Sequence, residues 1–174
     1  MLTNLAGSVL KCSLFGVAFT GLVAFSAAAD PLRLASAAGP FGDLAGIWTG
    51  DGLIKMKDGG QERVRCHGKY EVEPGGSNLR QELRCASDSY KFEMSTNISA
   101  TGGQLAGNWS ENTRHVAGHI TGRANSTAID ARAEGDTFTA LFAVHTQGDQ
   151  QSVTISSPGS AIAEVSIQLA RGAR

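Results

Sequence analysis

From residue 45 onward, apolar and polar residues alternate with a period of two, and clusters of Gly, Asn, Asp and Ser separate the alternating runs. This period is typical of β-strands with one buried face, and no window keeps a helical period over three turns. The pattern predicts ten strands, at 46–56, 62–73, 78–86, 90–99, 104–111, 116–124, 127–134, 137–145, 152–156 and 163–170. Every connection is short enough for a hairpin, so we expect an antiparallel meander.

A flat sheet of this size would expose one apolar face and two free edges, so the meander should close on itself. The predicted fold class is therefore all-β, an antiparallel up-and-down meander closed into a barrel of about 8 to 10 strands. The residues expected to face inward are Trp48, Ile54, Met56, Val64, Tyr70, Leu83, Phe92, Met94, Ile98, Trp109, Val116, Ile120, Phe138, Phe142, Val144, Val153, Ile155, Val165, Ile167 and Leu169. Glycines lie between them, and we expect these to permit sharp coiling more than to leave room for a ligand.

The segment 63–89 defines one hairpin register. When its apolar residues face inward and its opposite charges pair outside, Cys66 lies opposite Cys85. A four-residue loop at 74–77 makes them a non-hydrogen-bonded pair, with Cα atoms about 4.5 Å apart, which a disulfide tolerates. We therefore predict a Cys66–Cys85 disulfide; the alternative is two separate buried thiols.

Residues 1–29 have the layout of a signal peptide, with the base Lys11, an apolar run at 13–25 and a cleavage site near Ala29. The apolar run is too short for a stable membrane anchor. Cleavage would leave an even number of cysteines in an exported chain, periplasmic or secreted. Residues 30–44, rich in Pro, Gly and Ala, are expected to form a flexible arm, and 45–171 a single barrel domain.

Charge and motif content exclude several functions. The chain has 15 basic and 16 acidic residues, which argues against a nucleic acid partner. On a strand, His115 and His119 would lie about 13 Å apart, so we predict no metal site. An acid pair of Asp51 and Glu111 is disfavoured because Asp51 should point outward and Glu111 ends its strand. With no nucleophile elbow, phosphate loop or dinucleotide fingerprint, we expect no cofactor and no enzymatic activity.

The two ends of the barrel segment resemble lipocalins. The triplet Gly46-Ile47-Trp48 opens the first predicted strand, and Arg171 follows the last one, where lipocalins place a basic residue across that tryptophan. The chain lacks the lipocalin C-terminal helix, and its strand count is more similar to that of fatty-acid-binding proteins, the other calycin branch. The resemblance implies barrel closure through Trp48 and Arg171, and a small apolar molecule held in the barrel mouth.

Few polar side chains are expected inside the barrel, and Tyr70 would lie opposite Gln81. One interpretation is that these two satisfy each other and fill the interior. The other makes them the polar groups of an apolar pocket. The predicted ligand-binding residues are Trp48, Tyr70, Gln81, Phe92, Met94 and Trp109.

The primary functional hypothesis is an exported, monomeric barrel that binds a small apolar or amphipathic ligand. The alternative is an interaction module with a protein partner. Small periplasmic barrels that inhibit metalloproteases provide the precedent, and residues 30–44 would then enter a protease cleft.

Overall fold

The structure, a computed structural model, describes residues 39–136 and 139–172. The predicted signal peptide and residues 30–38 of the predicted arm lie outside these residues. A 3-10 turn, η1 (Gly42–Leu44), precedes ten strands. The strands are β1 (Gly46–Met56), β2 (Gln61–Val72), β3 (Asn78–Ala86), β4 (Lys91–Thr101), β5 (Gln104–Glu111), β6 (Val116–Ala124), β7 (Ala128–Gly135), β8 (Thr139–Gln147), β9 (Gln150–Ser156) and β10 (Ile162–Arg171).

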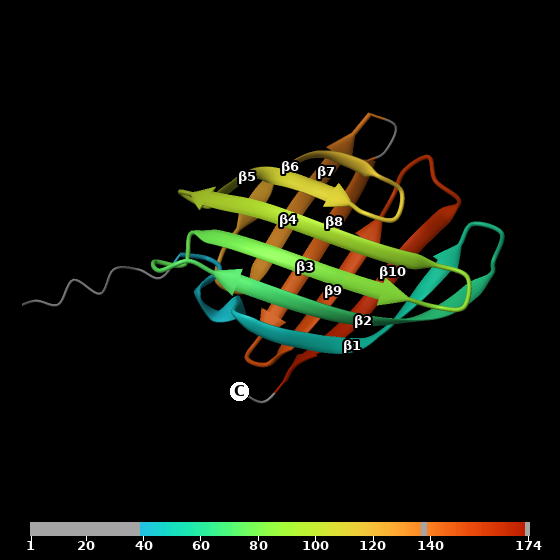
Figure 1. The fold of residues 1–174 in the computed structure, drawn as a ribbon, viewed down its shortest axis with the longest axis horizontal. Coiled ribbons are helices and arrows are strands. Elements are labelled where there is room, and N and C mark those ends of the chain that lie inside the picture. The colour runs from blue at the N-terminus through green and yellow to red at the C-terminus, as the bar shows by residue number, and fades with distance from the viewer. Residues whose placement is uncertain (1–38, 137–138, 173–174) are drawn as a thin grey trace, which may run out of the picture. The chain divides into compact units, whose positions relative to one another are not determined.

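The ten strands form a closed antiparallel barrel. Each strand pairs with its neighbours in the chain, and β10 returns to pair with β1. In Figure 1, β2 to β5 lie in front of β7 to β10 and cross them at an angle. The predicted fold class is confirmed. Among the described residues, no helix has the length and apolar character needed to cross a membrane.

Every strand end lies within two residues of its predicted position. The largest extensions are at the hairpins whose loops are shorter than expected. Gly102 and Gly103 have φ values of 56° and 80°, which suit a two-residue turn, and the ladder therefore continues to Thr101 opposite Gln104. Gly148, with φ of 58°, similarly lets β8 and β9 pair as far as Gln147 and Gln150.

The hairpin of β2 and β3 has the predicted register. Cys66 pairs with Cys85 and forms a disulfide, and Tyr70 pairs with Gln81. Further along the same ladder, Val72 pairs with Leu79. The disulfide prediction is thus confirmed.

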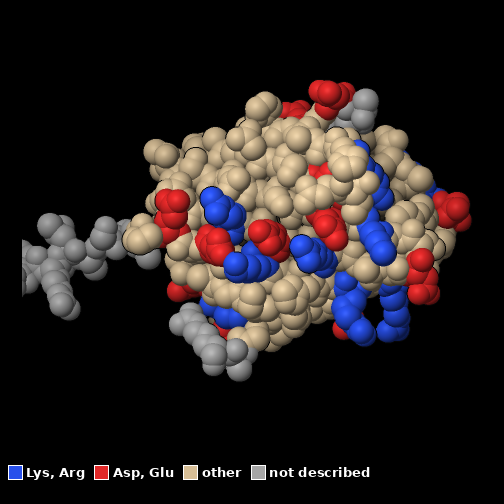
Figure 2. Space-filling model, in the orientation of Figure 1, with Lys and Arg blue, Asp and Glu red and all other residues tan. Residues whose placement is uncertain are grey.

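Inward and outward residues alternate around the barrel. Of the residues predicted to face inward, those that the structure describes are buried or half-buried, with Val116 as the exception at 37% exposure. Val116 is exposed because it begins β6 at one end of the barrel. On the outer face, charges of both signs are interspersed (Figure 2), and some form cross-strand pairs such as Lys55 with Glu164 at 3.1 Å.

Glycines allow some neighbouring strands to approach closely. A Cβ atom on Gly50 would lie 1.8 Å from the carbonyl oxygen of Gln168 on β10, and one on Gly118 would lie 1.8 Å from that of Glu134 on β7. A side chain at either position would force the strands apart. These glycines therefore permit the close approach of neighbouring strands.

One end of the barrel is sealed by residues that were expected to belong to a flexible arm. The side chains of Phe41 and Leu44 are buried, at 0% and 3% exposure, and belong to the hydrophobic core. The N–H groups of Gly39 and Phe41 donate to the carbonyls of Gly75 and Gly76, at 2.7 and 3.0 Å. For residues 39–44 the prediction of a flexible arm is therefore wrong, because burial of two large apolar side chains outweighs the weak order of a Gly-rich segment.

Candidate functional site

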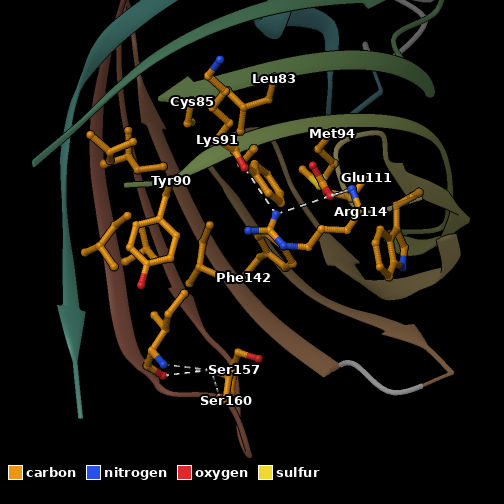
Figure 3. A pocket seen from close by; sticks show the side chains of 18 of the residues that line it. Leu83, Cys85, Tyr90, Lys91, Met94, Glu111, Arg114, Phe142, Ser157 and Ser160 are labelled. Atoms are coloured by element: carbon orange, nitrogen blue, oxygen red, sulfur yellow. Dashed lines mark hydrogen bonds and ion pairs between the residues drawn. The ribbon is translucent and has the colours of Figure 1, made fainter. Parts of the chain in front are cut away.

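A cavity of about 260 Å³ lies inside the barrel, at the end opposite η1. Its walls come from nine of the ten strands and from the connections at 87–90, 112–115 and 157–161 (Figure 3). The lining residues are mostly aliphatic or aromatic: Ile54, Val64, Leu83, Cys85, Tyr90, Lys91, Phe92, Met94, Trp109, Glu111, Arg114, Val116, Phe142, Ile155, Ser157, Ser160, Ile162, Val165 and Ile167. The volume is just below the range of about 300–1,000 Å³ usual for small-molecule pockets.

Because side chains alternate between the two faces of a strand, every second residue of these strands points into the barrel interior, where the cavity lies. On β4, Phe92 and Met94 face inward, and on β5 Trp109 and Glu111 do so. Because successive inward residues are two apart, Glu111 takes the place that another apolar residue would take in a filled barrel. The carboxylate therefore enters the cavity wall at the end of its strand.

The Glu111 carboxylate is buried, with 2% of its side chain exposed, and is surrounded by donors. Its Oε1 accepts hydrogen bonds from the N–H groups of Glu93 and Thr113, at 3.0 and 3.1 Å, and from the Thr113 hydroxyl. Its Oε2 accepts from the N–H of Arg114 at 2.8 Å. Burial by itself would raise the pKa of Glu111, but these donors together lower it to about 2. Glu111 is therefore ionised at neutral pH and anchors the turn that follows β5.

Arg114, in that turn, extends its side chain toward the cavity (Figure 3). Its Nη1 donates to the main-chain carbonyl of Lys91 at 3.3 Å and to the Thr113 hydroxyl at 3.3 Å. Nη1 also lies 3.5 Å from Glu111 Oε2. About half of the Arg114 side chain, 54%, is exposed. The guanidinium is thus tethered at one nitrogen and open on another side.

The structure places the predicted ligand-binding residues in three different surroundings. Phe92, Met94 and Trp109 line the cavity. Tyr70 and Gln81 instead border a second, deeper space of about 60 Å³, which Met94 also borders.

Trp48 lines neither space. Its ring is fully buried, its Nε1 donates to the carbonyl of Leu44 at 2.8 Å, and its centroid lies 5.9 Å from that of Tyr70. Arg171, its partner across the β1–β10 pairing, lies over the same indole. Trp48 and Arg171 therefore belong to the sealed end of the barrel, away from the larger cavity.

Tyr70 finds its hydrogen-bond partner across the barrel interior. Although it is paired with Gln81 in the ladder, its hydroxyl donates to Oε1 of Gln151 on β9, at 2.9 Å. Gln151 Nε2 donates in turn to the hydroxyl of Thr146, at 3.0 Å, and Gln81 Oε1 accepts from Thr96, at 3.2 Å. Burial raises the pKa of Tyr70 well above its usual value, an effect that the Gln81 side chain partly opposes. Tyr70 is therefore a donor in a buried polar network with Gln151 and Thr146.

Sequence reasoning did not identify Glu111 and Arg114 as polar residues of the cavity mouth. Asp51 points outward as expected, with 78% of its side chain exposed, near Arg65. Glu111 lies two residues after the inward-facing Trp109, so it faces the interior too. That position could have indicated a site, because a buried carboxylate must be surrounded by hydrogen-bond donors. The sequence pattern could not place Arg114, because it lies in a turn, where alternation does not assign a side chain to either face. Among the described residues, no group of three His, Cys, Asp or Glu side chains could hold a metal ion.

Comparisons with known proteins give a fold and no family. No family model matches the sequence, and no curated protein matches it. The structure is similar to that of the S-type phycobiliprotein lyase CPES from Guillardia theta, with a TM-score of 0.53 and 12% sequence identity. The match covers 77% of this chain and 91% of that one. The chain thus shares its barrel fold with that protein.

The comparison also corrects one expectation from the sequence. We expected no enzymatic activity because familiar catalytic motifs were missing, yet a barrel of the same fold bears the name of a lyase. The prediction that the chain is not an enzyme is therefore contradicted: absent hydrolase and nucleotide-binding motifs do not exclude activity for a barrel of this kind.

Proposed function

We propose that the barrel binds a small apolar or amphipathic molecule in the cavity of about 260 Å³ at its open end. That cavity is the observation that carries the proposal. Protein interiors are packed to the density of organic crystals, and voids larger than a water molecule are few. An apolar cavity of this size leaves the facing side chains without contacts on one side, and a ligand of matching size would supply them.

The shape of the barrel supports the same function. The end near η1 is filled by Phe41, Leu44 and Trp48, whereas the opposite end leaves Val116 exposed at the edge of the cavity. A ligand would enter between the connections at 87–90, 112–115 and 157–161. The structural similarity adds that a barrel of this fold occurs in a protein named a phycobiliprotein lyase.

Export of the chain is part of the proposal. The Cys66–Cys85 disulfide suits an oxidising compartment. The predicted cleavage near Ala29 would release a barrel with both of its cysteines paired. The alternative, an arm that inserts into a protease, requires residues 30–44 to be free, and residues 39–44 are held against the barrel.

A neutral fluorescent probe tests ligand binding directly. N-phenyl-1-naphthylamine should brighten on binding to the native protein, and native mass spectrometry of the purified protein should reveal any co-purifying small molecule. Val165→Phe would place a ring in the cavity and should abolish probe binding. Thr154→Phe, on the exposed face of the neighbouring strand β9, is the matched control and should bind like the wild type. Failure of the wild-type protein to bind the probe, or unchanged binding by Val165→Phe, would refute the proposal.

A further inference from the structure

We infer that Arg114 binds an anionic group of the ligand, so that the occupant of the cavity is a small amphipathic organic anion, such as a carboxylate or sulfonate. This inference rests on the proposed function, because it assigns the chemistry of a ligand held in that cavity. The walls of the cavity are apolar, whereas the guanidinium of Arg114 extends toward the cavity from the turn after β5 (Figure 3).

The charged residues that line the cavity play different parts. Lys91 contributes its main-chain carbonyl, which accepts from Arg114, while its side chain belongs to the exposed, outward set of β4. Glu111 already accepts three main-chain hydrogen bonds, at 2.8 to 3.1 Å. Arg114 is therefore the charged group positioned to meet a ligand.

The hydrogen bonds of Arg114 leave one edge of its guanidinium available. Within the described part of the chain, every hydrogen bond and ion pair of this side chain uses Nη1. The Nε–H and Nη2–H groups point along a different edge, and two such parallel donors match the two oxygens of a carboxylate. The tether at Nη1 pre-orients the fork, which lowers the entropy lost when an anion binds.

The ion pair with Glu111 engages only one nitrogen of the Arg114 guanidinium, Nη1. The carboxylate is closer to main-chain N–H donors, the nearest at 2.8 Å, than to the guanidinium at 3.5 Å. Those donors use most of the hydrogen-bonding capacity of the carboxylate, so Glu111 anchors the turn through main-chain N–H groups. The guanidinium, with about half of its side chain exposed, keeps capacity for a second anion.

Two probes that share one aromatic skeleton test the assignment. 8-Anilino-1-naphthalenesulfonate carries a sulfonate, and N-phenyl-1-naphthylamine lacks it. The loss of a charge-assisted hydrogen bond predicts that Arg114→Gln weakens binding of the sulfonate probe by about tenfold or more and that of the neutral probe by less than about twofold. Lys57 lies in the turn after β1, next to the connection at 157–161, and its exposed side chain does not line the cavity. Lys57→Gln therefore removes a charge from the same end of the barrel and should change neither affinity by more than about twofold.

Each outcome separates this inference from the proposed function. Selective loss of the sulfonate probe in Arg114→Gln, with Lys57→Gln unchanged, supports the assignment. Equal effects of Arg114→Gln on both probes, an equal selective loss in Lys57→Gln, or wild-type binding of the neutral probe alone would overturn it while leaving the proposed function standing. If the wild type binds neither probe, the proposed function fails and this inference fails with it.

Discussion

The guanidinium carbon of Arg171 lies 4.6 Å from the ring centroid of Trp48, across the pairing of β1 with β10 that closes the barrel. The same guanidinium donates from Nη1 to the carbonyl of Ala45, at 3.2 Å, and from Nη2 to the carbonyls of Asp43 and Gly148. One side chain thus ties the first strand, the last strand and the N-terminal turn together.

Arg171→Ala should therefore destabilise the protein strongly. The cation–π contact is worth about 0.5 to 2 kcal/mol, and charge-assisted hydrogen bonds add to it, so we expect a loss of about 2 to 4 kcal/mol. Urea unfolding measures this loss, and tryptophan emission should shift because the Trp48 environment changes. Arg65→Ala, which removes an arginine that is 87% exposed, is the control and should leave the urea midpoint near that of the wild type. A midpoint for Arg171→Ala equal to that control would show that closure does not depend on this residue.

Loss of the disulfide should lower the free energy of unfolding. Cys66 and Cys85 are 19 residues apart in the sequence, and closing a loop of about that length stabilises a protein by about 3 kcal/mol in the chain-entropy model. The double substitution Cys66→Ala with Cys85→Ala should show this loss in urea unfolding. A reductant should bring the wild type close to the double variant and leave the double variant unchanged. An oxidised wild type no more stable than the variant would contradict the expectation.

Glu111 should make stability depend on pH in the acidic range. Its pKa of about 2 in the folded protein is below the ordinary value of 4.5. A carboxyl group with a lowered folded-state pKa stabilises the protein fully above its unfolded pKa and loses this contribution as the pH falls through the folded value. The contribution at neutral pH is at most about 3 kcal/mol.

Glu111→Gln tests this directly by urea unfolding at several pH values. The wild type should be more stable than the variant at pH 7, and the difference should shrink as the pH falls from about 4.5 toward 2. Thr113→Val, which removes the hydroxyl that donates to the same carboxylate, should show a smaller change of the same kind. A difference that stays constant with pH would mean that the Glu111 carboxylate is not selectively stabilised in the folded state.

Tyr70→Phe should reduce stability without affecting ligand binding. The substitution leaves Oε1 of Gln151 buried without its donor, which costs about 1 to 3 kcal/mol. Since Tyr70 does not line the larger cavity, affinity for N-phenyl-1-naphthylamine should stay within about twofold. The double variant Tyr70→Phe with Gln151→Leu should regain part of the lost stability, because both polar partners are then gone. Weakened probe binding by a folded Tyr70→Phe would place the ligand deeper in the barrel.

The sequence by itself determined the strands, the order of their pairing and the disulfide. Alternation of period two is a local property, because each residue's face follows from its neighbours. Short turns then pair each strand with the next, and the register that places Cys66 opposite Cys85 is the one that keeps the apolar residues of both strands inside. A shift of one residue would turn every side chain to the wrong face, so the register was strongly specified.

Only the tertiary structure decided what lies inside the barrel. Tyr70 and Gln151 are 81 residues apart, on strands that are not neighbours, and their contact depends on the curvature of the closed sheet. The burial of Phe41 depends on the space that the strands leave at one end, and the cavity depends on the volume left unfilled at the other. Arg114 reaches that cavity from a turn, where alternation assigns no face. Strand periodicity says which residues face inward, but the distances between them across the interior follow only from how the barrel closes.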